Sequence, residues 1–544
     1  MKRSIIIGID GASWNVLNIL REERAIPAIS DLIQNGVYGS LKSTIPYFTG
    51  PAWVSFATGR RPSEHSIYDF LRVDMERKKV RVVNSGDIRS KTYYELLNSN
   101  GLKTIIINLP VSYPPRYDCG IIISCFLTMD KDRMVSPLKI KERYPDMFSR
   151  YKTFPEGKIE DISNYINELS YMEETRFELA KRLFAEEEWD HFFLLFSGTD
   201  WLSHATLGRF FDGDITIKQR FINFWQEIDR YISWFLDRLD RGTTCFIISD
   251  HGSIPKRFIF NINRFLYEMG FATKRINHTV KDNDNDKDND LLPTIINNVE
   301  TQKKGYHIPV RLSVVRRNRY LRYIASKINL FLIRYLNIYI RDENSRSYVD
   351  IYKSLVFSPS VSSAGVYIKR NDNYNEIRDM VIDKLTSIEN PYTGGRVILN
   401  VWKREELHKG TYMEFAPDII FVPVDGVACV TEIRERESVV EKVSDGSGCH
   451  NSEGIFLAYG PGIKKSKEVY NAGIADIFPT LFYSMDQSIP EGLDGRLLSD
   501  IFEEDYLKKN IPRYKIISLN NEERIEEESN EEEVKRRLKG LGYI

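Results

Sequence analysis

The chain has 544 residues, of which 42% are hydrophobic, and its 76 basic and 77 acidic residues leave a formal net charge of -1. This length exceeds what one compact domain usually holds, so we expect a main domain with insertions. The near-neutral charge gives no general attraction to nucleic acid. The five scattered cysteines, without a CxxC pair, argue against a disulfide framework and against a thiolate zinc site.

The first apolar run, residues 5–9, is closed by Asp10. It is too short for the core of a signal peptide or for a transmembrane helix, and it predicts a first buried β-strand. We therefore expect a cytoplasmic protein without a transmembrane segment.

Four β-favouring runs each end in polar residues, and helical patterns at 159–187 and 219–238 separate some of them. The runs and their tips are 4–9 before Asp10-Gly11, 103–107 before Asn108, 191–196 before Ser197 to Asp200, and 244–248 before Ser249-Asp250-His251-Gly252. This alternation predicts an α/β fold with a largely parallel central sheet and helices on both faces. Ligands bind at the carboxyl ends of the strands in such sheets.

The segment Thr49-Gly50-Pro51-Ala52-Trp53 precedes an apolar run at 54–57 and predicts the start of a buried helix at Thr49. The free N–H groups and the dipole at a helix N-terminus favour an anion, an alkoxide or a phosphate. Thr49 is therefore either an ordinary helix cap or a hydroxyl placed for chemistry.

Three carboxylates, Asp10, Asp200 and Asp250, follow apolar strands, and His204 and His251 lie close to two of them. Each alone is equally explained as a turn or structural residue. Asp200 and His204 have the i, i+4 spacing that places two ligands on one face of a helical turn. A mixed oxygen and nitrogen set without thiolate suits zinc or manganese.

Five motifs in this order resemble those of the alkaline phosphatase superfamily, in its type I phosphodiesterase and nucleotide pyrophosphatase branch. They are Asp10-Gly11, Thr49 with Thr58-Gly59, Asp200-x-x-x-His204, Asp250-His251-Gly252, and His450 in Gly448-Cys449-His450. Weaker similarities at 108–110, 113–115 and 416–419 extend the resemblance over most of residues 1–500, apart from an insertion.

The resemblance implies a site with two divalent cations, zinc or alternatively manganese. One ion is expected on Asp200, His204 and His450, and the other on Asp10, Asp250, His251 and the hydroxyl of Thr49. It further implies in-line attack by Thr49 and a covalent phosphothreonine intermediate. Gly50 is expected to leave its backbone N–H open to the developing negative charge.

Phe70 stands at a position where contact with substrate is expected, but it departs from the family pattern, because the family has an Asn there that helps to hold the phosphoryl oxygen. Nucleotide specificity is therefore not implied. Asn108 is a candidate for a replacement polar contact with substrate, and is equally explained as a strand-end turn residue. The sulfatase branch is disfavoured, since no Cys/Ser-x-Pro-x-Arg motif surrounds Thr49.

We expect the catalytic core to comprise residues 1–252 and 346–500, interrupted by an inserted cap segment at 253–345. In that segment, 281–290 is a low-complexity polar run that predicts a loop. Residues 309–341 carry eight basic and no acidic residues on an amphipathic pattern. This pattern fits either a cap helix or a face that contacts anionic membrane lipid or a polyanionic substrate. The tail, 501–544, is expected to hold a surface helix without chemistry.

These observations favour a metal-dependent hydrolase of phosphate esters, most simply a phosphodiesterase acting on a small-molecule or lipid-headgroup substrate and on no specific nucleic acid. A phosphomonoesterase or a phosphotransferase would use the same metals and the same threonine. The alternative from a different class is a non-catalytic protein that binds a polyanion on this scaffold.

Overall fold

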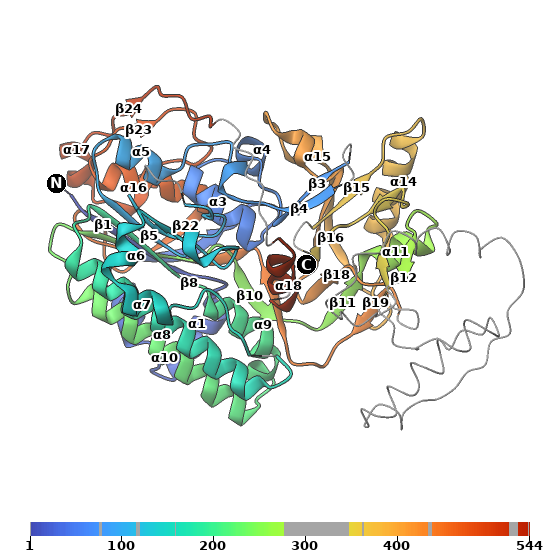
Figure 1. Ribbon diagram of the computed structural model, residues 1–544, viewed down its shortest axis with the longest axis horizontal. Helices are drawn as coiled ribbons and strands as arrows, with labels where there is room; N and C mark the ends of the chain where they lie inside the picture. The colour runs from blue at the N-terminus through green and yellow to red at the C-terminus, as the bar shows by residue number, and fades with distance from the viewer. Residues whose placement is uncertain are drawn as a thin grey trace, which may run out of the picture.

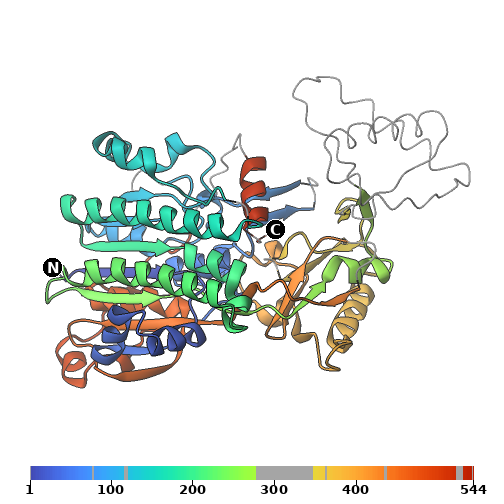
Figure 2. The same cartoon turned by 90° about the horizontal axis from the view of Figure 1, so that it is seen from below.

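The computed structural model describes residues 2–75, 79–115, 120–157, 159–276, 347–361, 364–433, 438–521, 531–541 and 543. These residues form two lobes that lie side by side (Figures 1 and 2). The predicted polar run at 281–290 and the basic segment at 309–341 lie outside the described residues.

The larger lobe is built on a sheet in which nine of the described strands take the order β22-β2-β21-β9-β1-β8-β5-β6-β7. The central strands β9, β1, β8, β5 and β6 pair in parallel, whereas β21 and β7 run antiparallel to their neighbours. The strands are β1 Ser4–Ile9, β2 Val37–Lys42, β5 Thr104–Ile107, β6 Ile121–Ile123, β7 Val135–Ser136, β8 His191–Phe196, β9 Thr244–Ile248, β21 Glu453–Tyr459 and β22 Lys467–Gly473.

Helices cover both faces of this sheet because both faces are apolar. Ile5, Ile7 and Ile9 face one hydrophobic core and Ile6 faces the other. The first face is covered by α1 Trp14–Glu22, α2 Pro27–Asn35, α8 Ile162–Glu186, α9 Gly198–Phe211 and α10 Ile215–Leu236, and the second by α3 Thr49–Thr58, α5 Tyr93–Ser99 and α16 Ile477–Ser484 (Figure 1). The predicted α/β fold is therefore confirmed.

The smaller lobe has its own hydrophobic core, formed by side chains from both sides of residues 277–346. The sequence predicts an inserted segment from 253 to 345. In the structure, β11, which precedes residues 277–346, pairs with β18 and β19, which follow them. The lobe contains β11 Phe258–Asn261, α11 Ile262–Glu268, β12 Lys274–Ile276, β13 Ser347–Val349, β14 Val356–Phe357, β15 Gly365–Ile368, α14 Tyr374–Ser387, β16 Ile398–Lys403, α15 Arg404–Leu407, β17 Ile419–Pro423, β18 Val427–Val430 and β19 Val440–Lys442.

Several short elements complete the larger lobe and its junction with the smaller one. The strands β10 and β20 pair antiparallel, with Ser253 opposite His450. The remaining elements are β3 Leu71–Asp74, β4 Lys79–Val82, α4 Pro62–His65, α6 Lys139–Arg143, α7 Pro145–Arg150, β10 Gly252–Pro255, β20 Gly448–Asn451, β23 Ile489–Pro490, α17 Glu504–Lys509, β24 Tyr514–Lys515 and α18 Glu531–Gly540. Among the helices within the described ranges, none is long and apolar enough to cross a bilayer.

Helix α18 corrects the expectation of a purely surface helix in the tail. It lies at the junction of the two lobes (Figure 1), and its Val534 and Leu538 are fully buried in the core of the larger lobe. The acidic first turn and basic last turn do suit the helix dipole. That charge pattern is the same whether or not one face of the helix is buried.

Candidate active site

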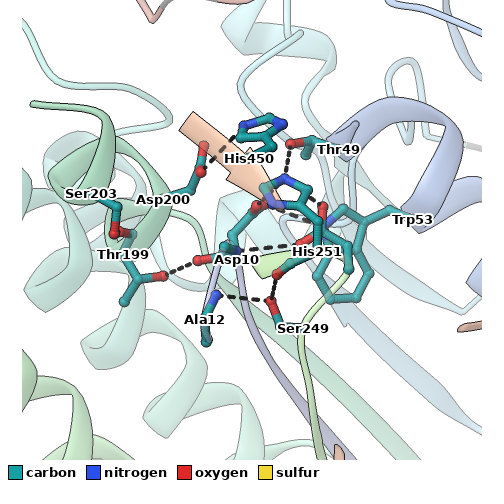
Figure 3. A network of polar contacts seen from close by, with 12 residues as sticks. Asp10, Ala12, Thr49, Trp53, Thr199, Asp200, Ser203, Ser249, His251 and His450 are labelled. Carbon is teal, nitrogen blue, oxygen red and sulfur yellow. Dashed lines mark hydrogen bonds and ion pairs between the residues drawn. The ribbon is translucent and has the colours of Figure 1, made fainter. Parts of the chain in front are cut away.

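Asp10 begins the site, directly after strand β1. Its N–H donates to the carbonyl of Phe196 at 3.0 Å, and its own carbonyl accepts from Thr199 Oγ1 at 2.6 Å, so the backbone is fixed between two strand ends. Trp53 Nε1 donates to Asp10 Oδ2 at 3.2 Å (Figure 3). Gly8 makes room for that indole, because a Cβ there would lie 2.7 Å from the Trp53 ring.

Asp200 and His204 lie one turn apart on α9, as their spacing predicts. His204 Nε2 is 3.4 Å from Asp200 Oδ2, and His450 Nε2 is 3.5 Å from Asp200 Oδ1. The two imidazole nitrogens face each other at 2.8 Å. His450 reaches this position because β20 pairs with β10, which continues directly from the strand end that carries Asp250.

His251 lies between the carboxylates. Its Nδ1 is 3.1 Å from the carbonyl of Gly252, which can only accept, so Nδ1 carries the proton and a neutral ring has a lone pair on Nε2. That Nε2 faces Asp250 Oδ2 at 3.2 Å and Asp10 Oδ1 at 3.7 Å. A lone pair and two carboxylate oxygens that face one another repel, and a cation bound between them would remove this repulsion.

The donor atoms fit a centre with two metal ions. Two groups of three buried side chains, Asp200, His251 and His450, and Asp10, Asp250 and His251, each bring one ligand atom within 4.8 Å of the others. Asp10 Oδ1, Asp200 Oδ1 and Asp250 Oδ2 are buried and receive no hydrogen bond from the described residues. Buried carboxylate oxygens without donors are expected where a metal completes the coordination.

The electrostatics of the site agree with this geometry. Burial, together with the charges of Asp250 and Asp200, raises the pKa of Asp10 well above its ordinary value, and burial and Asp200 raise the pKa of Asp250 to about 7. Burial lowers the pKa of His204 and of His251 to about 4. Both imidazoles are thus neutral at pH 7, and the crowded carboxylates lack a neutralising charge.

Thr49 is the first residue of α3, and the cap position belongs to Phe48, so the Thr49 hydroxyl does not cap the helix. Thr49 Oγ1 lies 3.2 Å from His251 Nε2 and 3.4 Å from the phenolic oxygen of Tyr543. The side chain is fully buried. This hydroxyl therefore lies against the second group of candidate ligands.

The three expected substrate contacts have different surroundings. A Cβ on Gly50 would be 3.1 Å from the ring of Phe70, so Phe70 lies directly against the start of α3. Asn108 Nδ2 donates to the carbonyl of Leu195 at 3.0 Å and to Ser197 Oγ at 3.2 Å. Its amide nitrogen is therefore engaged in holding the end of β8, whereas Oδ1 is buried and receives no hydrogen bond from the described residues.

Tyr543, which follows α18 and is only 1% exposed, is a further residue of the site that was not predicted from the sequence. Its hydroxyl donates to Asp200 Oδ2 at 3.0 Å. Burial raises the pKa of Tyr543 well above its ordinary value, so the phenol stays protonated. The helical spacing of Val534 and Leu538 was the available signal that one face of the tail is buried.

A mostly parallel α/β sheet with two clusters of buried Asp and His at its strand ends is the arrangement of the metal-dependent hydrolases of the alkaline phosphatase type. The model of the family "Type I phosphodiesterase / nucleotide pyrophosphatase" matches residues 4–452, and the chain belongs to that family. Among curated proteins, no sequence matches it.

Solved structures show the same fold at low sequence identity. Phosphonoacetate hydrolase from Sinorhizobium meliloti 1021, in complex with phosphonoformate, superposes with a TM-score of 0.54 at 14% identity, over 89% of this chain and 95% of that chain. An inactive variant of murine ectonucleotide pyrophosphatase / phosphodiesterase 5, in complex with AMP, has a TM-score of 0.50 at 13% identity, over 92% of this chain and 100% of that chain.

Proposed function

We propose that this protein is a phosphodiesterase that uses Thr49 as its nucleophile and forms a covalent phosphothreonine intermediate. The observation that carries the proposal is the position of Thr49 Oγ1, at the N-terminus of α3 and 3.2 Å from His251 Nε2, beside two clusters of buried Asp and His. This hydroxyl does not cap α3, and its hydrogen-bond contacts are with His251 and Tyr543, which both lie against the buried carboxylates.

In the first step the Oγ1 of Thr49 attacks phosphorus, an Oγ1–P bond forms, and the bond from phosphorus to the leaving oxygen breaks. The proton that the threonine hydroxyl loses balances the proton that the leaving group gains as it departs as an alcohol. In the second step a water oxygen attacks phosphorus and the Oγ1–P bond breaks, which restores the threonine hydroxyl. Two divalent cations, zinc or manganese, held by Asp200, His204 and His450 and by Asp10, Asp250, His251 and Thr49, would lower the pKa of the hydroxyl and neutralise the phosphoryl charge.

The protein groups each have a defined task in this scheme. The N–H groups of the first turn of α3, including that of Gly50, offer hydrogen bonds to negative charge on the phosphoryl oxygens. His251 keeps a fixed tautomer through the Gly252 carbonyl, so its Nε2 stays a lone-pair donor. Trp53 holds the carboxylate of Asp10 in one orientation.

A diester substrate is favoured over a monoester by the placement of Arg60 and Arg61, which follow the end of α3 opposite to Thr49. Arg60 pairs with Glu64 at 2.6 Å, and Arg61 pairs with Asp494 at 3.4 Å. Both guanidinium groups are thus engaged with acids and are not arranged to bind the additional charge of a monoester. A monoesterase or phosphotransferase would share the nucleophile and the metals, so substrate tests must include both esters.

The test is turnover of bis(4-nitrophenyl) phosphate, 4-nitrophenyl phosphate and 4-nitrophenyl sulfate by protein loaded with zinc or manganese. The diester should be the best substrate, and Thr49→Ala should lose at least about 10³-fold in kcat, as other enzymes do when the nucleophile is removed. Thr58→Ala, which removes a buried hydroxyl at the other end of α3, is the matched control.

Acid quenching during turnover should trap one phosphoryl group on Thr49, which peptide mass spectrometry can locate. Equal activity of Thr49→Ala and Thr58→Ala would refute the proposed nucleophile. Failure of all three esters with metal-loaded protein would instead favour the non-catalytic alternative.

A further inference from the structure

Helix α18 carries Tyr543 into the site and is itself firmly anchored. Val534 and Leu538 are fully buried in the core of the larger lobe. Arg537 Nη1 donates to the carbonyl of Thr128 at 2.6 Å, and Lys535 Nζ donates to the carbonyl of Val80 at 3.2 Å. The position of Tyr543 is therefore set by packing and hydrogen bonds along the helix that precedes it.

The phenolic oxygen of Tyr543 lies at the centre of the candidate site. It is 3.0 Å from Asp200 Oδ2, 3.4 Å from Thr49 Oγ1 and 3.2 Å from Trp201 Nε1. The indole N–H of Trp201 can only donate, so the phenolic oxygen accepts from it and has its own proton to give. In this structure that proton goes to Asp200.

The ring of Tyr543 is held by aromatic contacts. It is stacked on Phe126 with the ring centroids 5.8 Å apart and an interplanar angle of 12°, and it meets Phe70 edge to face at 5.1 Å. Phe70 lies against Gly50 and has no polar atom to offer. The hydroxyl of Tyr543 places a hydrogen-bond donor on this side of Thr49.

We propose that Tyr543 binds the phosphoryl group of the substrate, and that its phenolic O–H donates a hydrogen bond to a non-bridging oxygen during attack by Thr49. The inference rests on the proposed function, because a phosphoryl group attacked by Thr49 Oγ1 has its non-bridging oxygens next to that atom. The phenol has one O–H, so its hydrogen bond to Asp200 is exchanged for one to the substrate when the phosphoryl group binds. A neutral donor of this kind suits the single charge of a phosphodiester.

The experiment compares Tyr543→Phe with Tyr144→Phe in full-length, metal-loaded protein. Tyr144 is also buried, and its hydroxyl donates to Glu187 at 2.8 Å, so its variant loses a similar tyrosine–carboxylate bond away from Thr49. With bis(4-nitrophenyl) phosphate, Tyr543→Phe should lower kcat by about 10²-fold, the usual effect of removing one donor to a developing charge. Tyr144→Phe should leave kcat unchanged, and both variants should retain the wild-type metal content.

A second measurement does not depend on turnover. Inorganic phosphate, titrated by calorimetry into Thr49→Ala protein, should bind about tenfold more tightly than to the double variant Thr49→Ala/Tyr543→Phe, the loss expected for one hydrogen bond to a charged group. Equal phosphate affinity of the two proteins would overturn the inference even if Tyr543→Phe lost activity through misfolding.

Other results would separate this inference from the proposed function. Wild-type activity in Tyr543→Phe, with Thr49→Ala inactive, would overturn the role of Tyr543 and leave the nucleophile in place. Higher activity in Tyr543→Phe would overturn it by showing that the phenol blocks the site. Recovery of full activity with excess zinc would show that Tyr543 acts only through Asp200. Full activity in Thr49→Ala would refute the proposed function itself, and the inference would fall with it.

Discussion

Substitution of Gly11 by Ala should weaken metal binding without replacing any candidate ligand. Gly11 has φ of +66°, and a Cβ built there would lie 2.7 Å from Asp200 Oδ1 and 2.9 Å from Ser253 Oγ. Contacts this short force the ends of the Asp200 and Ser253 side chains to move. Gly101 provides a matched control, since its φ is +80° and a Cβ there would meet nothing within 4 Å.

Both variants place an L-residue in the left-handed region, which costs roughly 1–2 kcal/mol. Both should therefore lose a similar amount of stability from backbone strain, and Gly11→Ala should lose more because of its contacts. Only Gly11→Ala displaces Asp200, so its metal affinity should fall by about 10- to 100-fold, the range seen when the support of a ligand is disturbed. That loss corresponds to about 1.4–2.7 kcal/mol.

Competition with a chromogenic chelator gives the zinc affinity, and thermal unfolding with and without zinc gives the stability. Zinc should raise the melting temperature of Gly101→Ala as much as that of the wild type, and that of Gly11→Ala less. If Gly11→Ala held zinc as tightly as Gly101→Ala, the inference that Asp200 Oδ1 is a ligand at its observed position would be refuted.

Three further changes test other parts of the molecule. Trp53→Phe keeps the aromatic packing and removes the donor to Asp10, so chelator competition should show metal affinity lower by about tenfold. Burial lowers the pKa of His191 to about 3, so its neutral form contributes stability that is lost as pH falls from about 6.5 towards 3. In chemical unfolding at pH 4–6, His191→Gln should therefore reduce the slope of the unfolding free energy against pH by about 1.4 kcal/mol per pH unit. An unchanged slope would contradict this. Glu173→Ala leaves the buried guanidinium of Arg176 without its carboxylate partner, so the free energy of unfolding in urea should fall by about 3–5 kcal/mol. A fall below about 1 kcal/mol would argue against a buried ion pair between the two side chains.

The strand-end residues could be predicted because their signal is local. Strands β1 and β8 begin and end at the residues that the apolar runs mark, and Asp10 and Asp200 follow them within a few residues. A buried run closed by a polar residue specifies both a strand and its tip. The i, i+4 spacing then fixed the relation of Asp200 to His204 as soon as the helix was correctly placed.

Long-range placement could not be read from such local patterns. His450 stands 199 residues beyond His251 and reaches it only through the pairing of β20 with β10; only the resemblance to a family pointed to it. The hydroxyl of Thr49 could equally have capped α3, because a threonine before an apolar run looks the same in the sequence whether it caps the helix or lies in its first turn. The structure assigns the cap to Phe48, which leaves the hydroxyl of Thr49 inside the site.

The tail shows why a charge pattern alone misplaces a helix. Three glutamates at the start of α18 and two basic residues in its last turn stabilise any helix in water, so they carry no information about burial. Burial depends on what faces Val534 and Leu538, and that surface is assembled from strands and helices hundreds of residues away. Once the helix packs there, Tyr543 falls between Thr49 and Asp200. Residues that reach a site through tertiary packing are therefore those that sequence patterns miss, and changes to the buried face of α18 should act on the active site as directly as changes near Thr49.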